Sequence, residues 1–265
     1  MAWISRRSTL FRWELGTDVW CIEYDSDIPL EHQCSGSTIN DLIDEVFADL
    51  QHHQGDLEYL VSRAILCPKS SHVDAMNDLI LQRLDRVARM YHTIDSVDVS
   101  TDALYPTEFL NSLNISGLSP HKLTHKIGMV LILLRSISIL QTWCSGTRLI
   151  LRGFSNNYLK AEVATGDQAG KIVMLPRIPI CLTSLPLNFK RRQFPVRPVF
   201  AITINKSQGQ TLAVAGLYLP QPVFAHGKLY VAVSRESIAS GLKTLSLDRV
   251  GNKRTSMKNV VYREI

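Results

Sequence analysis

Residues 200–211 read FAITINKSQGQT, and this stretch decides how the rest of the chain is interpreted. A short apolar run, Phe200–Ile202, leads directly into a cluster of Thr, Asn, Lys, Ser, Gln and Gly residues. Open α/β sheets bind ligands at the carboxyl ends of their strands, and glycine allows the backbone to approach a phosphate closely. The stretch therefore predicts a ligand-binding edge of a sheet. The alternative is a surface loop that is polar by chance, which explains this order of residues poorly.

The segments around this stretch are typical of an α/β layer. Residues 38–50 repeat apolar side chains at helical spacing after Ser37, a plausible N-cap. The further expected elements are strands at 63–67, 199–202, 213–219 and 243–247, and helices at 71–84 and 224–234.

A different pattern occupies the middle of the chain. Residues 121–175 hold short apolar runs separated by Gly, Ser, Asn and Asp: 121–127, 129–137, 147–153, 158–165 and 171–175. Several short strands at regular spacing predict a small β-barrel or sheet. The economical interpretation is one α/β domain interrupted by an inserted β module.

The composition is that of an ordinary soluble globular protein. The chain has 265 residues, a net charge of +5 and a mean hydropathy of +0.02. Its five cysteines include no C-x-x-C pair, which argues against a disulfide framework and a zinc knuckle. The most apolar stretch, Met129–Leu140, is too short to span a bilayer and contains Arg135. We therefore expect an intracellular protein with no membrane partner.

The charge is distributed unevenly along the chain. Residues 1–120 sum to −11, residues 121–210 to +11, and residues 211–265 to +5. A section this basic is typical of a protein that binds a polyanion, and nucleic acid is the commonest one in cells. A solvated basic face that complements the acidic first section explains the charge equally well.

Two short motifs resemble nucleotide sites without meeting their requirements. The run Gly166–Ile172 has three residues between its glycines instead of four, and Ile172 stands where a phosphate loop has Ser or Thr. Leu42–Glu45 resembles a magnesium-binding strand end, but its apolar spacing is helical. His32 near Cys34 is an isolated pair, so no metal site is predicted.

A second informative segment is Leu229–Glu236, LYVAVSRE. Its apolar residues suit one face of a helix, with Arg235 at the far end. Such an arginine is usually a surface charge. Because this segment follows a predicted ligand-binding strand end, Arg235 has a second interpretation. Its guanidinium could reach the terminal phosphate of a nucleotide.

FAITINKSQGQTL followed by LYVAVSR resembles the fifth and sixth motifs of the Pif-one family of superfamily 1B DNA helicases, which includes the Helitron helicases. RAILCPKSSHVDAMN resembles the fourth-motif region, and residues 106–151 resemble the inserted β module. The resemblance implies an α/β, P-loop NTPase-like second RecA-like helicase domain, with a parallel sheet and an inserted small β-barrel. The implied bounds are 35–104 and 195–250 for the RecA-like domain and 105–194 for the barrel, with an unassigned extension at 1–34 and a basic, loosely held tail at 251–265.

The resemblance also assigns roles to residues. Arg235 matches the arginine finger, a catalytic and nucleotide-binding role. Gln208 and Gly209 are expected to contact the nucleotide. Four other residues are expected to contact the DNA: Thr203, Asn205, Lys206 and Ser207. Ser70 stands where the family usually has Asn, and His125 falls at a usually apolar strand position.

The implied family activity is ATP- and Mg²⁺-dependent 5'-to-3' unwinding of DNA in replication, repair, recombination and telomere maintenance. The chain contains no phosphate loop, so we expect it to bind no ATP tightly and not to act as an autonomous helicase. Single-stranded DNA is the expected partner, with a first RecA-like domain supplied in trans, and the nucleus is the expected location. The alternatives are a non-enzymatic module that binds single-stranded DNA and a transposon-derived remnant.

Overall fold

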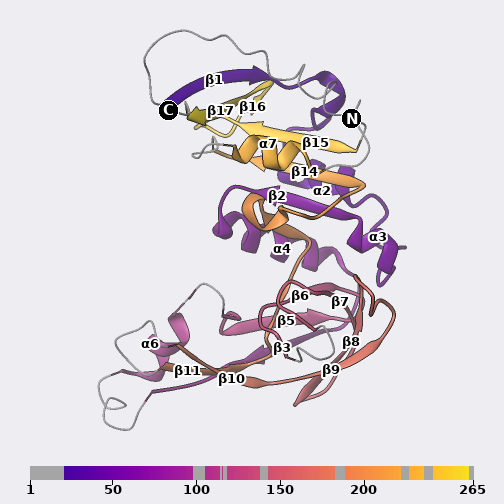
Figure 1. The fold of residues 1–265 in the computed structure, drawn as a ribbon, viewed down its shortest axis with the longest axis vertical. Helices are drawn as coiled ribbons and strands as arrows, with labels where there is room; N and C mark the ends of the chain where they lie inside the picture. The colour runs from indigo at the N-terminus through magenta and orange to yellow at the C-terminus, as the bar shows by residue number, and fades with distance from the viewer. Residues whose placement is uncertain are drawn as a thin grey trace. The chain divides into compact units, whose positions relative to one another are not determined.

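The computed structural model describes residues 21–97, 105–113, 115, 118–137, 143–182, 189–221, 227–235 and 241–262 (Figure 1). Contacts divide it into two compact units. The α/β unit comprises the chain up to residue 49, residues 62–80 and the chain from residue 200 onward. The insert unit comprises residues 50–61 and 81–199, so it begins earlier than the predicted residue 105. The reason is that the strand at 88–92 pairs with the strand at 122–126 and not with the parallel sheet.

The α/β unit contains the predicted parallel sheet. Its order is β13-β2-β14-β15-β16, and the first four strands are parallel. Their bounds are Ala201–Thr203 for β13, Arg63–Cys67 for β2, Val214–Leu219 for β14, Leu242–Leu247 for β15 and Lys253–Arg254 for β16. The interior strand β2 is buried from Ala64 to Cys67, as expected for a parallel strand covered on both faces.

Helices pack on this sheet. The helix α2, Ile39–Val46, contacts β14 and β15 and is shorter than predicted. Its N-cap is Thr38 and not the predicted Ser37, because the Thr38 hydroxyl accepts the Asp41 N–H at 3.2 Å in a capping box. Gly216 on β14 makes close packing possible, since a Cβ there would lie 2.8 Å from Val46 Cγ2.

The helix α4, Ser70–Arg83, follows β2, and one of its side chains hydrogen-bonds to the start of β13. The buried Asn77 amide oxygen accepts the Ala201 N–H at 2.9 Å, and its amide nitrogen donates to the Ala201 carbonyl at 3.3 Å. A buried side chain of α4 thus satisfies the backbone where β13 begins. Two short helices also occur in this part of the sequence. They are η2, Leu30–His32, in the α/β unit, and α3, Leu57–Val61, in the insert unit.

The segment at 251–265, predicted to be loosely held, contains a strand instead. β17, Ser256–Tyr262, pairs antiparallel with β1, Cys21–Asp27, which lies in the unassigned extension. The Ile28 N–H donates to the Thr255 carbonyl at 2.8 Å, continuing the pairing beyond the strands. Backbone hydrogen bonds therefore give both polar segments a regular structure that their side-chain pattern does not indicate.

The insert unit consists of antiparallel sheets. The largest has the order β12-β6-β7-β8-β9, a second has the order β10-β11-β4, and β3 pairs with β5. The bounds are Ala88–His92 for β3, Ile94–Ser96 for β4, Lys122–Lys126 for β5, Val130–Leu133 for β6, Arg148–Phe154 for β7, Tyr158–Val163 for β8, Ile172–Pro176 for β9, Ile178–Leu182 for β10, Phe189–Gln193 for β11 and Val196–Pro198 for β12; helix α6 spans Thr107–Ser112. The predicted strands of residues 121–175 are present, whereas the closing of these sheets into a small barrel stays a prediction.

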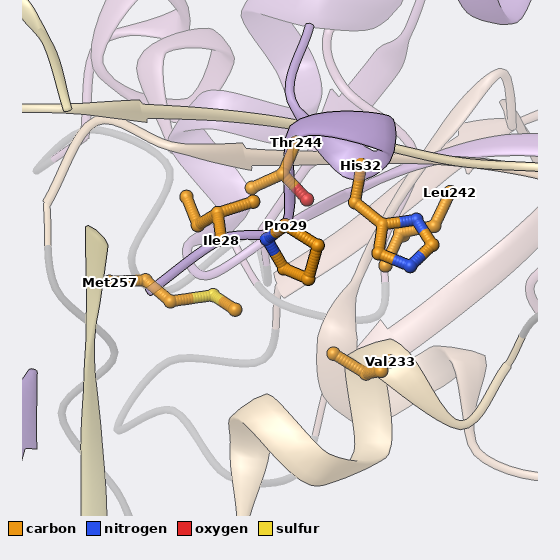
Figure 2. Close-up of a pocket in the computed structure, with 7 residues that line it drawn as sticks. All are labelled: Ile28, Pro29, His32, Val233, Leu242, Thr244 and Met257. Atoms are coloured by element: carbon orange, nitrogen blue, oxygen red, sulfur yellow. The ribbon is translucent and has the colours of Figure 1, made fainter. Parts of the chain in front are cut away.

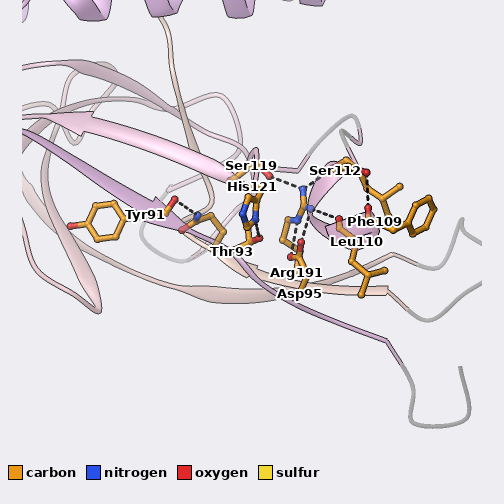
Figure 3. A network of polar contacts seen from close by, with 11 residues as sticks. Tyr91, Thr93, Asp95, Phe109, Leu110, Ser112, Ser119, His121 and Arg191 are labelled. Carbon is orange, nitrogen blue, oxygen red and sulfur yellow. Dashed lines mark hydrogen bonds and ion pairs between the residues drawn. The ribbon is translucent and has the colours of Figure 1, made fainter. Parts of the chain in front are cut away.

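A buried ion pair organises one part of the insert unit (Figure 3). Arg191 donates to both carboxylate oxygens of Asp95, at 2.9 and 2.7 Å, and the two side chains are 1% and 0% exposed. Arg191 also donates to the carbonyls of Leu110, Leu113 and Ser119. All five guanidinium N–H groups are thus paired, and they join β11, β4, α6 and the segment after α6.

Another polar side chain of the insert unit is buried without partners. His125 on β5 is 0% exposed and faces the rings of Tyr91 and Phe194. Neither ring nitrogen has a hydrogen-bond partner. Burial lowers the pKa of His125 to about 3, so the imidazole is neutral in the folded protein.

Two classes of feature are absent from the part of the chain that the structure describes. None of its helices is both long and apolar enough to cross a membrane. Nor do three or more His, Cys, Asp or Glu side chains come together there in a way that could hold a metal ion.

Candidate functional site

The polar motif lies where the parallel sheet predicts it, at the carboxyl end of β13. Directly after Thr203 the chain turns into the 3-10 helix η3, Ile204–Ser207. Ile204 is 1% exposed and anchors the turn in the core, while Asn205 and Lys206 are exposed and Thr203 is half-buried. Three of the four predicted DNA-contacting side chains are therefore accessible at one strand end.

The fourth predicted DNA-contacting residue, Ser207, is placed differently. It is 0% exposed, and its hydroxyl donates to the Ile204 carbonyl at 2.7 Å. The Ser207 carbonyl accepts the Gln210 N–H at 2.9 Å. In this structure Ser207 therefore holds the shape of the turn from which its neighbours project.

Gln208 and Gly209, the predicted nucleotide contacts, follow the turn and are exposed. Gly209 has a φ of +82°, and a Cβ there would meet no atom within 4 Å. Its glycine is required by the backbone conformation and not by crowding. The open space on this side leaves the backbone accessible to a ligand.

Arg235 follows the helix α7, Lys228–Val233, which begins after Gly227; residues 224–226 of the predicted helix lie outside the described residues. The half-buried Arg235 donates through Nε to the Val231 carbonyl at 3.0 Å and through Nη2 to the Ser234 hydroxyl at 2.9 Å. The guanidinium is therefore held against its own helix by neutral acceptors.

The two motifs, separated in sequence, lie together in the α/β unit. The Leu212 N–H donates to the Arg235 carbonyl at 2.9 Å, and α7 contacts η3. This hydrogen bond links the segment that carries Gln208 and Gly209 directly to the residue expected to act as an arginine finger.

The structure adds a cation that the sequence analysis did not select. Lys69 comes two residues after Cys67, which pairs with Thr203 across the β2–β13 ladder. Its ammonium group donates to Gln221 Oε1 at 2.6 Å, just beyond the end of β14. In the sequence, Lys69 is recognisable as a candidate because it lies directly after the buried strand RAILC, and the carboxyl ends of parallel strands share one edge of the sheet.

A small cavity lies next to Val233 of α7 (Figure 2). Ile28, Pro29, His32, Val233, Leu242, Thr244 and Met257 line it. Its volume of about 10 Å³ suits about one water molecule and is far too small for a nucleotide. We therefore assign it no ligand-binding role.

Comparison with sequence families and relatives finds similar proteins. Residues 108–154 match the family model described as DNA helicase Pif1, 2B domain. ATP-dependent DNA helicase PIF1 of Danio rerio is 28% identical over 189 residues, which are 69% of this chain and 27% of the relative. The Homo sapiens protein of the same name is 27% identical over 210 residues, 77% of this chain and 31% of the relative.

Solved structures show the same fold. The Pif1 helicase from Candida albicans has a TM-score of 0.56 at 20% identity and matches 81% of this chain and 54% of its own. Bacteroides Pif1 bound to ssDNA has a TM-score of 0.53 at 20% identity and matches 80% of this chain and 49% of its own. The class of protein is therefore a mixed α/β protein with a parallel sheet, built as in Pif1 helicases.

Within that class, the chain is a relative of the Pif1 family of DNA helicases. The match covers part of such a protein, since this chain spans 27% and 31% of the two curated relatives.

Proposed function

We propose that this chain is the C-terminal portion of a Pif1-like ATP-dependent DNA helicase, a second RecA-like domain with its inserted β-barrel. The observation that carries the proposal is the accessible polar end of β13 with Arg235 hydrogen-bonded beside it. The names of the curated relatives, ATP-dependent DNA helicases, support the same assignment.

Single-stranded DNA is the proposed ligand of the sheet edge. Asn205 and Lys206 are exposed, Thr203 is half-buried, and Lys69 adds a second cation on that edge. Amide, hydroxyl and ammonium donors are the groups that hold a phosphate backbone without reading its sequence. The related Bacteroides protein, solved bound to ssDNA, supports this choice of ligand.

The nucleotide would be held by Gln208, Gly209 and Arg235. The open space around Gly209 and the exposure of Gln208 fit a phosphate chain. ATP with Mg²⁺ would supply the phosphoryl group whose transfer drives unwinding. Arg235 would exchange the Val231 carbonyl and the Ser234 hydroxyl for a phosphate oxygen, and would place its positive charge where negative charge develops.

The remaining phosphate contacts would come from a first RecA-like domain. The 265 residues contain no phosphate loop, so we propose that hydrolysis requires such a domain in trans and that this chain by itself is not an autonomous helicase. Within a complete motor, 5'-to-3' unwinding in nuclear replication, repair, recombination or telomere maintenance is the proposed role.

A second candidate is a non-enzymatic module that binds single-stranded DNA. The charge of +11 over residues 121–210 favours it, because that section belongs largely to the insert unit and not to the nucleotide edge. Aromatic side chains of this section could stack on bases. Phe189 is 0% exposed and packs in the core, whereas Phe154 is half-buried and Tyr158 is exposed and accessible for stacking.

ATP hydrolysis and DNA binding by the purified chain test these proposals. We expect no hydrolysis above background, with or without single-stranded DNA, together with binding that weakens in Asn205→Ala and Lys206→Gln. Hydrolysis that is stimulated by DNA and lost in Arg235→Ala would refute the dependence on a second domain. Absence of DNA binding at low salt would refute both candidate functions.

A further inference from the structure

Two arginines of the insert unit converge on one tyrosine. Arg89 lies on β3, and Arg177 lies in the turn between β9 and β10. The guanidinium carbon of each is 5.3 Å from the centre of the Tyr91 ring. Arg89 also lies 5.7 Å from the Phe154 ring and Arg177 5.2 Å from the Phe194 ring. One cation from β3 and one from the turn after β9 thus lie against the same aromatic ring.

Neither cation has an acidic partner within the described residues. Arg89 donates to the Asn156 amide oxygen, and Arg177 donates to the His92 carbonyl at 3.0 Å. The Arg177 Nε is buried and unpaired.

Neighbouring arginines of the same unit are neutralised. Arg152 pairs with Glu162 at 2.7 Å, and Arg191 pairs with Asp95 at 2.7 Å. All five N–H groups of Arg191 are engaged, whereas Arg177 makes one hydrogen bond. Arg89 and Arg177 therefore keep both their charge and some of their donor capacity for a ligand.

A third cation reinforces the positive charge. Burial lowers the pKa of Arg177, and the positive charge of Arg192 on β11 lowers it further. Arg192 is exposed and belongs to the face of β11 opposite the buried Arg191. Like charges held together without an acid favour an anionic ligand, because an anion removes their mutual repulsion.

We propose that Arg89 and Arg177, with Arg192 near Arg177, bind the phosphodiester backbone of single-stranded DNA. This inference rests on the proposed function, and it adds to the sheet edge of the α/β unit a second contact on the insert unit. Guanidinium groups suit the task because they bind two phosphate oxygens at once. The aromatic rings beneath them would limit the conformational freedom lost when DNA binds.

Binding of a fluorescein-labelled oligothymidylate to the intact chain, measured over a range of salt concentrations, tests the proposal. In Arg89→Gln/Arg177→Gln, the slope of log K against log salt should fall by about 1.4, since each single-strand phosphate contact contributes about 0.7. If the contacts add nothing at 1 M salt, this slope corresponds to roughly 25-fold weaker binding at 0.1 M. The control Arg86→Gln/Lys171→Gln also removes two cations from exposed positions of the insert unit and should change both quantities much less.

A charge-preserving variant separates binding from packing. Arg89→Lys/Arg177→Lys should keep most of the salt slope, because lysine retains the positive charge. If this variant loses the salt slope as fully as the glutamine pair, the arginines act through packing against Tyr91 and the proposal is wrong. An unchanged slope in the glutamine pair, with normal binding by the unsubstituted chain, also refutes it. Absence of binding by the unsubstituted chain would instead refute the proposed function.

Discussion

Replacing Arg191 by alanine removes the centre of the buried network in the insert unit. The Asp95 carboxylate, 0% exposed, would keep its negative charge without a counter-charge. The carbonyls of Leu110, Leu113 and Ser119 would each lose a donor. Breaking a buried ion pair by removing one partner costs about 3–5 kcal/mol. That is a large part of the roughly 5–15 kcal/mol that stabilises a typical domain.

Urea unfolding of the intact chain measures this loss. With a denaturant dependence of about 2 kcal/mol per M, the midpoint of the affected transition should fall by roughly 1.5–2.5 M. Lys190→Ala is the matched control, because Lys190 precedes Arg191 on β11 and is exposed; it should shift the midpoint by less than about 0.3 M.

The double variant Arg191→Met/Asp95→Leu distinguishes the cost of leaving one buried charge unpaired from the cost of losing the ion pair itself. Removing both charges together should restore much of the stability, since apolar residues of similar volume replace buried ion pairs at little cost. A loss below about 1 kcal/mol in Arg191→Ala would refute the reasoning, because it would mean that water reaches Asp95 or that the network relaxes freely.

Three further predictions concern stability. The pKa of His125 is about 3 when folded and near 6.5 when unfolded, so stability present above pH 6.5 should fall as the pH drops toward 3, by up to about 1.4 kcal/mol per pH unit. His125→Leu should flatten this slope in urea titrations at several pH values, and an equal slope would contradict the assignment. Gly216→Ala should cost about 1–3 kcal/mol, because its Cβ would lie 2.8 Å from Val46 Cγ2; Gly153→Ala, whose Cβ would be 3.7 Å from its nearest neighbour, serves as the control in thermal unfolding. Thr38→Ala should cost about 1 kcal/mol and Thr38→Ser much less, and equal losses would exclude the capping role.

The sequence predicts the parallel sheet well because its signal is local. The predicted strands at 63–67, 213–219 and 243–247 each lie within one residue of their observed bounds, and the first two are largely continuous apolar runs. The helix predicted at 71–84 is observed as α4, Ser70–Arg83. The N-cap at Thr38 was missed by one residue because Ser37 and Thr38 are chemically equivalent caps in the sequence.

Features that depend on partners distant in sequence could not be predicted. β1 and β17 are polar segments, and only their mutual pairing makes them strands. Arg191 and Asp95 carry no local signal of their burial together. At the candidate site, residue types identified the strand end, but the inward turn of the Ser207 hydroxyl and the nearness of Lys69 depend on the fold around them.

The order of strands in the parallel sheet also governs when this protein can fold during synthesis. The interior strand β2 is flanked by β13 and β14, and both are encoded after the whole insert. At about 5–20 residues per second, a ribosome takes roughly 7–27 s to pass from Cys67 to Ala201. During that interval the buried run Ala64–Cys67 has neither of its neighbours, so nascent chains should depend on chaperones most strongly while the insert is being translated.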